Sequence, residues 1–229
     1  MKQFFKNVPT ILDVARRAYW RIRQKQKNTA PFPGSHEYWE HRYARGGSSG
    51  AGSYGKFADF KAKIINAFVH ENGVRSVIEY GCGDGNQLQL ADYPKYVGFD
   101  VSPSAVAACK EIFKLDPTKS FKLIEEYVGE TADLTLSLDV LYHLVEDDVF
   151  ESYMTRLFSS SDCYVIVYSS DTDNNFGYQG THVRHRKFTK WLDEHIPGWG
   201  LVRRIPNEYP YKGDPREGSF ADFYIYRKI

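Results

Sequence analysis

The sequence has no long apolar run and very little cysteine. None of its apolar runs reaches 18 residues, so no transmembrane helix is predicted. The amino terminus has no apolar stretch followed by a small-residue cleavage site, so no secretory signal is expected. Cys82, Cys109 and Cys163 form no CxxC pair and no metal-ligand spacing. We therefore expect no metal site and a reducing, cytoplasmic setting.

The chain also lacks a strong net charge, because 30 Lys and Arg face 29 Asp and Glu among 229 residues. Eight of the basic residues and only one acidic residue fall in residues 1–29, which leaves 22 basic and 28 acidic residues for the remainder. The body therefore lacks the basic character of a nucleic-acid-binding domain. The basic segment of residues 1–27 has two interpretations, a packing or oligomerisation helix and a peripheral contact with the inner face of a membrane.

From residue 74 onward, short apolar segments alternate with amphipathic ones. This pattern predicts a parallel sheet with helices on both faces. The predicted strands are Ser76–Tyr80, Tyr96–Phe99, Phe121–Ile124, Leu134–Leu138, Tyr164–Tyr168, Gly200–Ile205 and Ala221–Arg227. The predicted helices are residues 8–27, Phe57–Glu71, Gln87–Asp92, Pro103–Leu115, Glu146–Phe158 and Lys187–His195. The last two strands, joined by a Pro- and Gly-rich loop, are expected to pair antiparallel at one edge.

One strand runs directly into a glycine-rich loop, in the sequence VIEYGCGDGN. Glycine at positions 81, 83 and 85 allows a tight turn and a close approach of backbone to a ligand. The spacing is G-x-G-x-G and differs from the G-x-G-x-x-G of dinucleotide folds. Glu79 precedes the loop, and Asp100 ends the next strand, where one carboxylate can accept from two vicinal hydroxyls. The loop therefore predicts a nucleotide-like ligand at the carboxyl ends of the strands.

These motifs resemble those of class I S-adenosylmethionine-dependent methyltransferases over residues 77–168. The resemblance implies a Rossmann-like α/β fold: a doubly wound, mostly parallel seven-stranded sheet with an antiparallel C-terminal strand. It implies that the glycine loop cradles the amino-acid part of the cofactor and that Asp100 takes both ribose hydroxyls. The expected cofactor contacts are Tyr43, Glu79, Gly81, Cys82, Gly83, Gly85, Asn86, Asp100, Val101, Leu138 and Asp139. For the adenine, Glu125, Glu126 and Tyr127 remain alternatives.

The flanking segments are similar to those of small bacterial methyltransferases of surface-polysaccharide biosynthesis, over most of residues 36–229. This resemblance suggests O-methylation of a small-molecule or glycan acceptor. The chain has LDVLYH in place of an N/D-P-P-Y/F sequence after the fourth strand, which argues against amide or base nitrogen as the acceptor. A nicotinamide-dependent oxidoreductase and a cofactor-binding module without catalysis are the alternative hypotheses.

Two histidines are the candidate general bases, because imidazole suits proton transfer near neutral pH. His143 follows the fourth strand and His182 follows the fifth. The alternative is that His143 only caps or packs at the start of a helix and that His182 is solvated. The candidate substrate contacts are Tyr54, Tyr142, Arg184 and His185. Arg184 can bind a phosphate or carboxylate on the acceptor. Alternatively, the basic residues between His182 and Lys187 are only the solvent-exposed start of a helix.

The segment His36–Gly55 contains five glycines and three serines, too many to hold a regular element. Its aromatic part, Tyr38–Tyr54, has two interpretations. We expect it to close over the cofactor and exclude water, and an inert linker is the alternative. The domain organisation follows: residues 1–35 as basic helix and linker, and 36–229 as the methyltransferase domain. Within that domain, 36–72 is the lid and leading helix, 74–168 the cofactor-binding core, and 169–229 the substrate-side segment and C-terminal hairpin.

Overall fold

The computed structural model describes residues 32–175 and 180–229, and those from Gly34 to Ile229 belong to one unit. The predicted basic helix at residues 8–27, together with its membrane or oligomer role, lies outside the described residues. Among the described helices, none is both long and apolar enough to cross a membrane.

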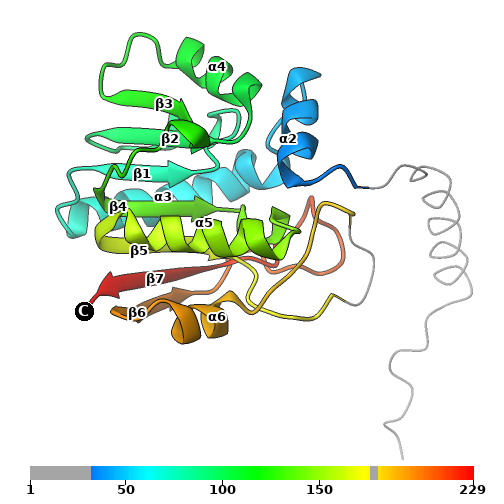
Figure 1. Cartoon of the computed structure of the whole chain (residues 1–229), viewed down its shortest axis with the longest axis vertical. Helices are drawn as coiled ribbons and strands as arrows, with labels where there is room; N and C mark the ends of the chain where they lie inside the picture. Colours follow the sequence, from blue (N-terminus) through cyan, green and yellow to red (C-terminus); the bar gives the residue numbers. More distant parts are fainter. Residues whose placement is uncertain (1–31, 176–179) are drawn as a thin grey trace, which may run out of the picture. The chain divides into compact units, whose positions relative to one another are not determined.

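A seven-stranded sheet forms the centre of this unit (Figure 1). Its strands are β1 (Val77–Tyr80), β2 (Tyr96–Asp100), β3 (Lys119–Leu123), β4 (Ala132–Leu138), β5 (Ser161–Ser169), β6 (Trp199–Ile205) and β7 (Asp222–Lys228). The spatial order is β3-β2-β1-β4-β5-β7-β6. Strands β1 to β5 pair in parallel, while β7 pairs antiparallel with both β5 and β6. The predicted fold class and the antiparallel edge are confirmed.

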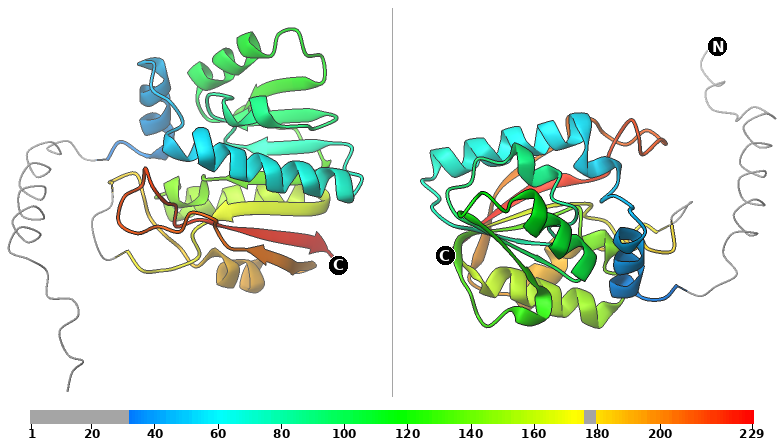
Figure 2. Two further views of the ribbon diagram at one scale, coloured as in Figure 1. Left: turned by 180° about the vertical axis from the view of Figure 1, so that it is seen from behind. Right: turned by 90° about the horizontal axis from the view of Figure 1, so that it is seen from above.

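Helices cover both faces of the sheet, as the views in Figure 2 show. They are α3 (Gly55–Glu71), α4 (Pro103–Ile112), α5 (Asp147–Ser159) and α6 (Phe188–His195), while α2 (Ser35–Ala44) lies at the carboxyl end of the strands. Side chains of α3 and α4 join one buried apolar cluster, and those of α5 and α6 join the other. Successive side chains of a strand point to opposite faces, so Ile166 packs in the first cluster while Val165 and Val167 pack in the second.

Two elements differ from the sequence-based expectation. Residues 36–55 were expected to hold no regular element, but α2 begins at Ser35 and a short 3₁₀ turn, η1, spans Ala51–Ser53. The expectation was wrong because the first glycine of the segment is Gly46, which leaves the ten residues of α2 free of helix breakers. The predicted helix at Gln87–Asp92 is a single 3₁₀ turn, η2 (Gln87–Leu90).

The strand order reverses between β1 and β4, which are neighbours although β2 and β3 lie between them in sequence. Loops at the carboxyl ends of these two strands separate toward opposite faces of the sheet and leave a crevice between them. The glycine loop follows β1, and Asp139 to His143 follow β4. The topology therefore brings the two motifs of the sequence to one place.

Candidate functional site

The glycine loop turns sharply where β1 ends. Gly81, Gly83 and Gly85 have φ angles of 83°, 58° and 76°, which residues with a side chain rarely adopt. A Cβ atom on Gly83 would lie 2.3 Å from Ser49 Oγ and 2.9 Å from Tyr43 Oη. Glycine is therefore needed both for the turn and for the close approach of another segment.

Asp100 ends β2 beside this loop. Its carboxylate accepts the backbone N–H of Gly83 at 2.8 Å and that of Ser102 at 2.9 Å. Burial raises the pKa of Asp100, and the backbone donors oppose that rise. Each carboxylate oxygen has more than one acceptor position, so the group can still accept from two further donors. Asp100 is thus a fixed acceptor, held in place by the loop that it supports.

Glu79 lies in β1 and is buried in the core beneath the loop. Its carboxylate accepts the Tyr96 hydroxyl at 2.8 Å. Burial raises the pKa of Glu79 to about 7, although the Tyr96 hydrogen bond and the charge of Lys61 oppose the rise.

Because of this raised pKa, we expect the stability of the fold to depend on pH through Glu79. Between pH 4.5 and about 7 the folded protein retains a proton that the unfolded chain releases, so the free energy of unfolding falls as pH rises. The shift corresponds to ~3 kcal/mol. The Glu79→Gln side chain cannot ionise, but its carbonyl oxygen still accepts the Tyr96 hydroxyl. In denaturant unfolding, the free energy of unfolding of Glu79→Gln relative to wild type should therefore increase from pH 5 to pH 8. A constant difference between the two proteins across that range would contradict the assignment, and the exposed Glu71→Gln is the matched control.

The chain between α2 and α3 lies against the glycine loop. Ser49 N–H donates to Asp84 Oδ2 at 2.7 Å, and the Asp84 N–H donates back to Ser49 Oγ at 3.0 Å. The Tyr54 hydroxyl also donates to Asp84 at 2.8 Å, and Asn86 Nδ2 donates to the Ser53 carbonyl at 2.7 Å. Asp84, inside the glycine motif, is therefore the residue that ties this segment to the loop.

Helix α2 is held over the carboxyl end of β2 by polar contacts. Glu40 accepts from the hydroxyls of Ser102 and Ser104 at the start of α4. His36 Nε2 donates to the Val101 carbonyl at 2.8 Å. Val101 thus lies under α2, beside Asp100.

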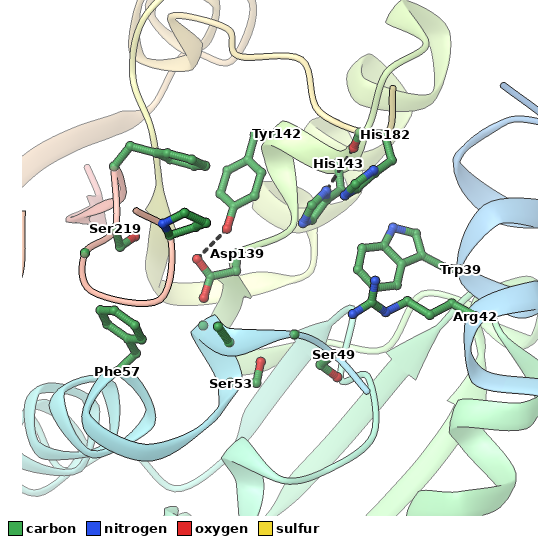
Figure 3. A pocket seen from close by; sticks show the side chains of 16 residues that line it. Trp39, Arg42, Ser49, Ser53, Phe57, Asp139, Tyr142, His143, His182 and Ser219 are labelled. Atoms are coloured by element: carbon green, nitrogen blue, oxygen red, sulfur yellow. Dashed lines mark hydrogen bonds between the residues drawn. The ribbon is translucent and has the colours of Figure 1, made fainter. Parts of the chain in front are cut away.

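A cavity of about 230 Å³ opens between this segment and the loops that follow β4 and precede β7 (Figure 3). Trp39 and Arg42 of α2 line it on the same side as the imidazoles of His143 and His182, against which Trp39 packs. The remaining lining residues are Ser49, Gly50, Ala51, Gly52, Ser53, Phe57, Asp139, Tyr142, Pro215, Gly218, Ser219 and Phe220. Six of the sixteen lining residues carry aromatic or imidazole rings, and Arg42 and Asp139 are the charged ones.

Asp139 is the carboxylate that lines this cavity. Its backbone φ is 62°, the one positive value among the described residues other than glycine. Its carboxylate accepts Lys61 Nζ at 2.6 Å and the Tyr142 hydroxyl at 2.6 Å. The Lys61 side chain is 1% exposed and that of Asp139 is 13% exposed, so the pair is nearly removed from water. These bonds fix the Asp139 carboxylate and the Tyr142 ring in the cavity wall.

We expect Lys61→Met to lower the free energy of unfolding by ~3–5 kcal/mol, because it leaves a buried carboxylate without its cation. The double variant Lys61→Met/Asp139→Asn should recover most of that loss, since it buries no uncompensated charge. Lys63→Met, an exposed position on the same helix, is the control and should have little effect. Chemical denaturation checks this, and a Lys61→Met protein as stable as Lys63→Met would contradict it.

His143 is held in a defined tautomer. Its Nδ1 lies 2.9 Å from the backbone carbonyl of His182, which can only accept, so Nδ1 carries the hydrogen. Its ring packs edge-on to Trp39 and stacks on the ring of His182, with centroid distances of 4.8 and 5.3 Å. Burial lowers the pKa of His143 to about 4. The imidazole is therefore neutral at pH 7, with an unprotonated Nε2.

His182 is held differently from His143. Its ring stacks on that of Tyr38 with a centroid distance of 4.5 Å. Burial lowers its pKa as well. Its backbone carbonyl fixes the other histidine, so His182 orients His143 through its main chain.

The other sequence-predicted residues fall into two groups. Tyr142 lines the cavity, whereas Cys82 and Leu138 are buried in the core beneath it. Arg184 does not line the cavity, because Nη1 bonds the Val145 carbonyl and pairs with Asp147 at 2.9 Å. His185 is buried behind Tyr142, where it bonds the Ser170 hydroxyl at 2.7 Å.

Trp39, Arg42 and Phe220 line the cavity but were not among the sequence-based site residues. Lys61, the buried partner of Asp139, was not among them either. Trp39 and Arg42 come from a segment that was expected to lack regular structure. Lys61 does carry a local signal, since it lies among the apolar residues on the buried face of α3. A cation at such a position predicts a buried acidic partner.

No protein-family model matches the chain, and no curated protein is similar to it in sequence. Solved structures do match. The N-methyltransferase NodS from Bradyrhizobium japonicum, in complex with S-adenosylhomocysteine, has a TM-score of 0.65 at 16% identity, over 85% of this chain and 98% of its own. Magnesium protoporphyrin IX methyltransferase from Synechocystis has a TM-score of 0.56 at 14% identity, over 96% and 99%. The methyltransferase domain of bacterial CtHen1 has 0.55 at 23% identity, over 73% and 97%. The chain therefore has the fold of class I S-adenosylmethionine-dependent methyltransferases.

Proposed function

We propose that the protein is an S-adenosylmethionine-dependent methyltransferase that acts on a hydroxyl of a small-molecule or glycan acceptor. The observation that carries the proposal is the buried Asp100 carboxylate, fixed by the backbone of the glycine loop. Beside it lies a cavity with a neutral histidine, whose lining residue Ser49 is bonded to Asp84 of that loop. The fold of the solved neighbours, some with bound S-adenosylmethionine or S-adenosylhomocysteine, supports the choice of cofactor.

The residues present fit that cofactor. Asp100 offers two acceptor positions for the ribose hydroxyls, and the positive-φ glycines give the loop a tight turn that Ser49 and Tyr43 approach closely. The Tyr43 hydroxyl lies close to Gly83, and Asn86 is fixed by its bond to the Ser53 carbonyl. Cys82 and Leu138 are buried. When bound, the cofactor supplies a methyl group on a cationic sulfonium, a leaving group that needs no acid.

His143 is proposed as the general base. Its Nδ1–H is held by the His182 carbonyl, so its Nε2 lone pair is free to take the proton of an acceptor hydroxyl. The Asp139 carboxylate in the same cavity favours the imidazolium that results. His182 acts as the residue that orients His143, in keeping with its carbonyl contact. We propose a hydroxyl oxygen as the acceptor because His143 is available as a base. A hydroxyl must lose its proton when it is methylated, whereas an anionic acceptor needs no base.

The acceptor is proposed to occupy the cavity between Trp39, Tyr142 and Phe220. Aromatic faces suit the apolar face of a sugar ring, and their hydroxyl and indole groups give polar contacts at the edges. The described part of the body has no excess of basic residues, so we do not propose a nucleic acid.

A thermal-shift comparison tests the choice of cofactor. S-adenosylhomocysteine should raise the unfolding temperature, since a ligand that binds only the folded state stabilises it by mass action, and NAD should leave it unchanged. The reverse result would favour a nicotinamide-dependent oxidoreductase. Binding without methyl transfer to any compound in a glycan and metabolite panel would instead favour a module without catalysis.

A further inference from the structure

Arg42 lies in the last turn of α2 and reaches into the cavity (Figure 3). Its Nε donates to the backbone carbonyl of Ser48 at 2.5 Å, which fixes the direction of the guanidinium. The guanidinium also lies over the Trp39 ring, 5.4 Å from the centroid. Its Nη2 is close to the lining residue Gly50, where an added Cβ atom would lie 3.7 Å away. The terminal nitrogens are thereby held in the cavity wall.

The cavity has no anion of its own to pair with this cation. Asp139 is bonded to Lys61 and Tyr142. His143 and His182 are both neutral at pH 7, because burial lowers the pKa of each. Among the described residues, Arg42 takes part in no ion pair within 4.0 Å. A fixed guanidinium beside aromatic walls is thus the one uncompensated charge among the residues that line the cavity.

From this arrangement we propose that Arg42 binds a carboxylate of a ligand in the cavity. A guanidinium presents parallel N–H donors whose spacing matches the two oxygens of a carboxylate. Since Nε is occupied by Ser48, the contact uses the terminal nitrogens. This inference rests on the proposed function, which offers two sources of a carboxylate: the methionine part of the cofactor, and an acidic acceptor such as a uronic acid.

Calorimetry with two cofactor fragments tests the first source. S-adenosylhomocysteine has the carboxylate, whereas 5′-methylthioadenosine lacks the whole amino-acid part. In Arg42→Gln, affinity for S-adenosylhomocysteine should fall about 10- to 100-fold while affinity for 5′-methylthioadenosine stays unchanged. In Arg42→Lys the affinity for S-adenosylhomocysteine should fall less, because lysine keeps the positive charge and loses only the pair of parallel N–H donors. Arg45→Gln, an exposed position at the end of the same helix, is the matched control and should bind both ligands as wild type does.

The second source is tested on protein saturated with S-adenosylhomocysteine. If glucuronate binds wild type more tightly than glucose does, and Arg42→Gln removes that preference while leaving S-adenosylhomocysteine affinity intact, the carboxylate belongs to the acceptor. The proposal is overturned if Arg42→Gln changes neither the affinity for S-adenosylhomocysteine nor the preference for glucuronate over glucose. It is also overturned if affinities for S-adenosylhomocysteine and 5′-methylthioadenosine fall equally, because the loss then does not depend on a carboxylate. Failure of wild type to bind S-adenosylhomocysteine would instead refute the proposed function, so the two failures are distinguishable.

Discussion

Replacing Asp100 with alanine should abolish detectable binding of S-adenosylhomocysteine in calorimetry. The substitution removes a buried carboxylate that is held by two backbone donors and aimed at the glycine loop. Loss of two charge-assisted hydrogen bonds from a ligand lowers affinity by more than about 100-fold. The loop also loses its support at Gly83, which adds to the effect.

Two further proteins separate ligand binding from folding in this experiment. Asp116→Ala removes a half-buried carboxylate before β3, at the amino end of the parallel strands, and should bind as wild type does. Asp100→Asn keeps the shape of the side chain and removes its charge, so it should unfold close to wild type yet bind far more weakly. Wild-type affinity in Asp100→Ala would refute the assignment of this carboxylate to the ribose.

Replacing His143 with glutamine should lower kcat for methyl transfer by ~100- to 10,000-fold, the range ascribed to a general base. Cofactor affinity should remain near that of wild type, because the contacts of His143 are with Trp39 and His182 and not with the glycine loop. The pH profile adds an independent measure. Since the pKa of His143 is lowered to about 4, the acid limb that it controls should fall near pH 4 and not near 6.5.

The control for this variant is His70→Gln, at the exposed end of α3. It should retain full activity and an unchanged profile. Equal kcat in His143→Gln and wild type would contradict a base at this position. A comparable loss in a His182→Gln protein, with His143 still neutral and in place, would move the role of base to His182.

The sheet could be predicted from the sequence because its signal is local. A buried parallel strand reads as a short apolar run, as CYVIVY does in β5. β4 instead alternates leucine with threonine and serine, which is the two-residue period of a strand. The glycine loop and Asp100 could also be predicted, since both are set by where a strand ends. The local signal of α2 was misread. The glycines from Gly46 onward led to the expectation that residues 36–55 hold no regular element, but α2 ends before the first of them.

The cavity itself could not be predicted in the same way. Its walls come from α2, η1, the loop after β4 and the segment before β7, which are joined only by the tertiary fold. The contact between Lys61 and Asp139 spans 78 positions in the sequence. The sequence alone does not distinguish Arg184 from Arg42 as a ligand contact. In the structure Arg184 is paired with Asp147 away from the cavity, whereas Arg42 lines it. Such choices depend on distance in space, which composition and spacing do not encode.

Transfer of a labelled methyl group tests the central claim most directly. The protein is incubated with methyl-labelled S-adenosylmethionine and an extract of cells from its source, and labelled products are identified by mass spectrometry. We expect label in a hydroxyl-bearing small molecule or glycan with wild type, and little label with Asp100→Ala or His143→Gln. A wild-type protein that binds no S-adenosylmethionine and labels no compound, under conditions where it is folded, would contradict the account.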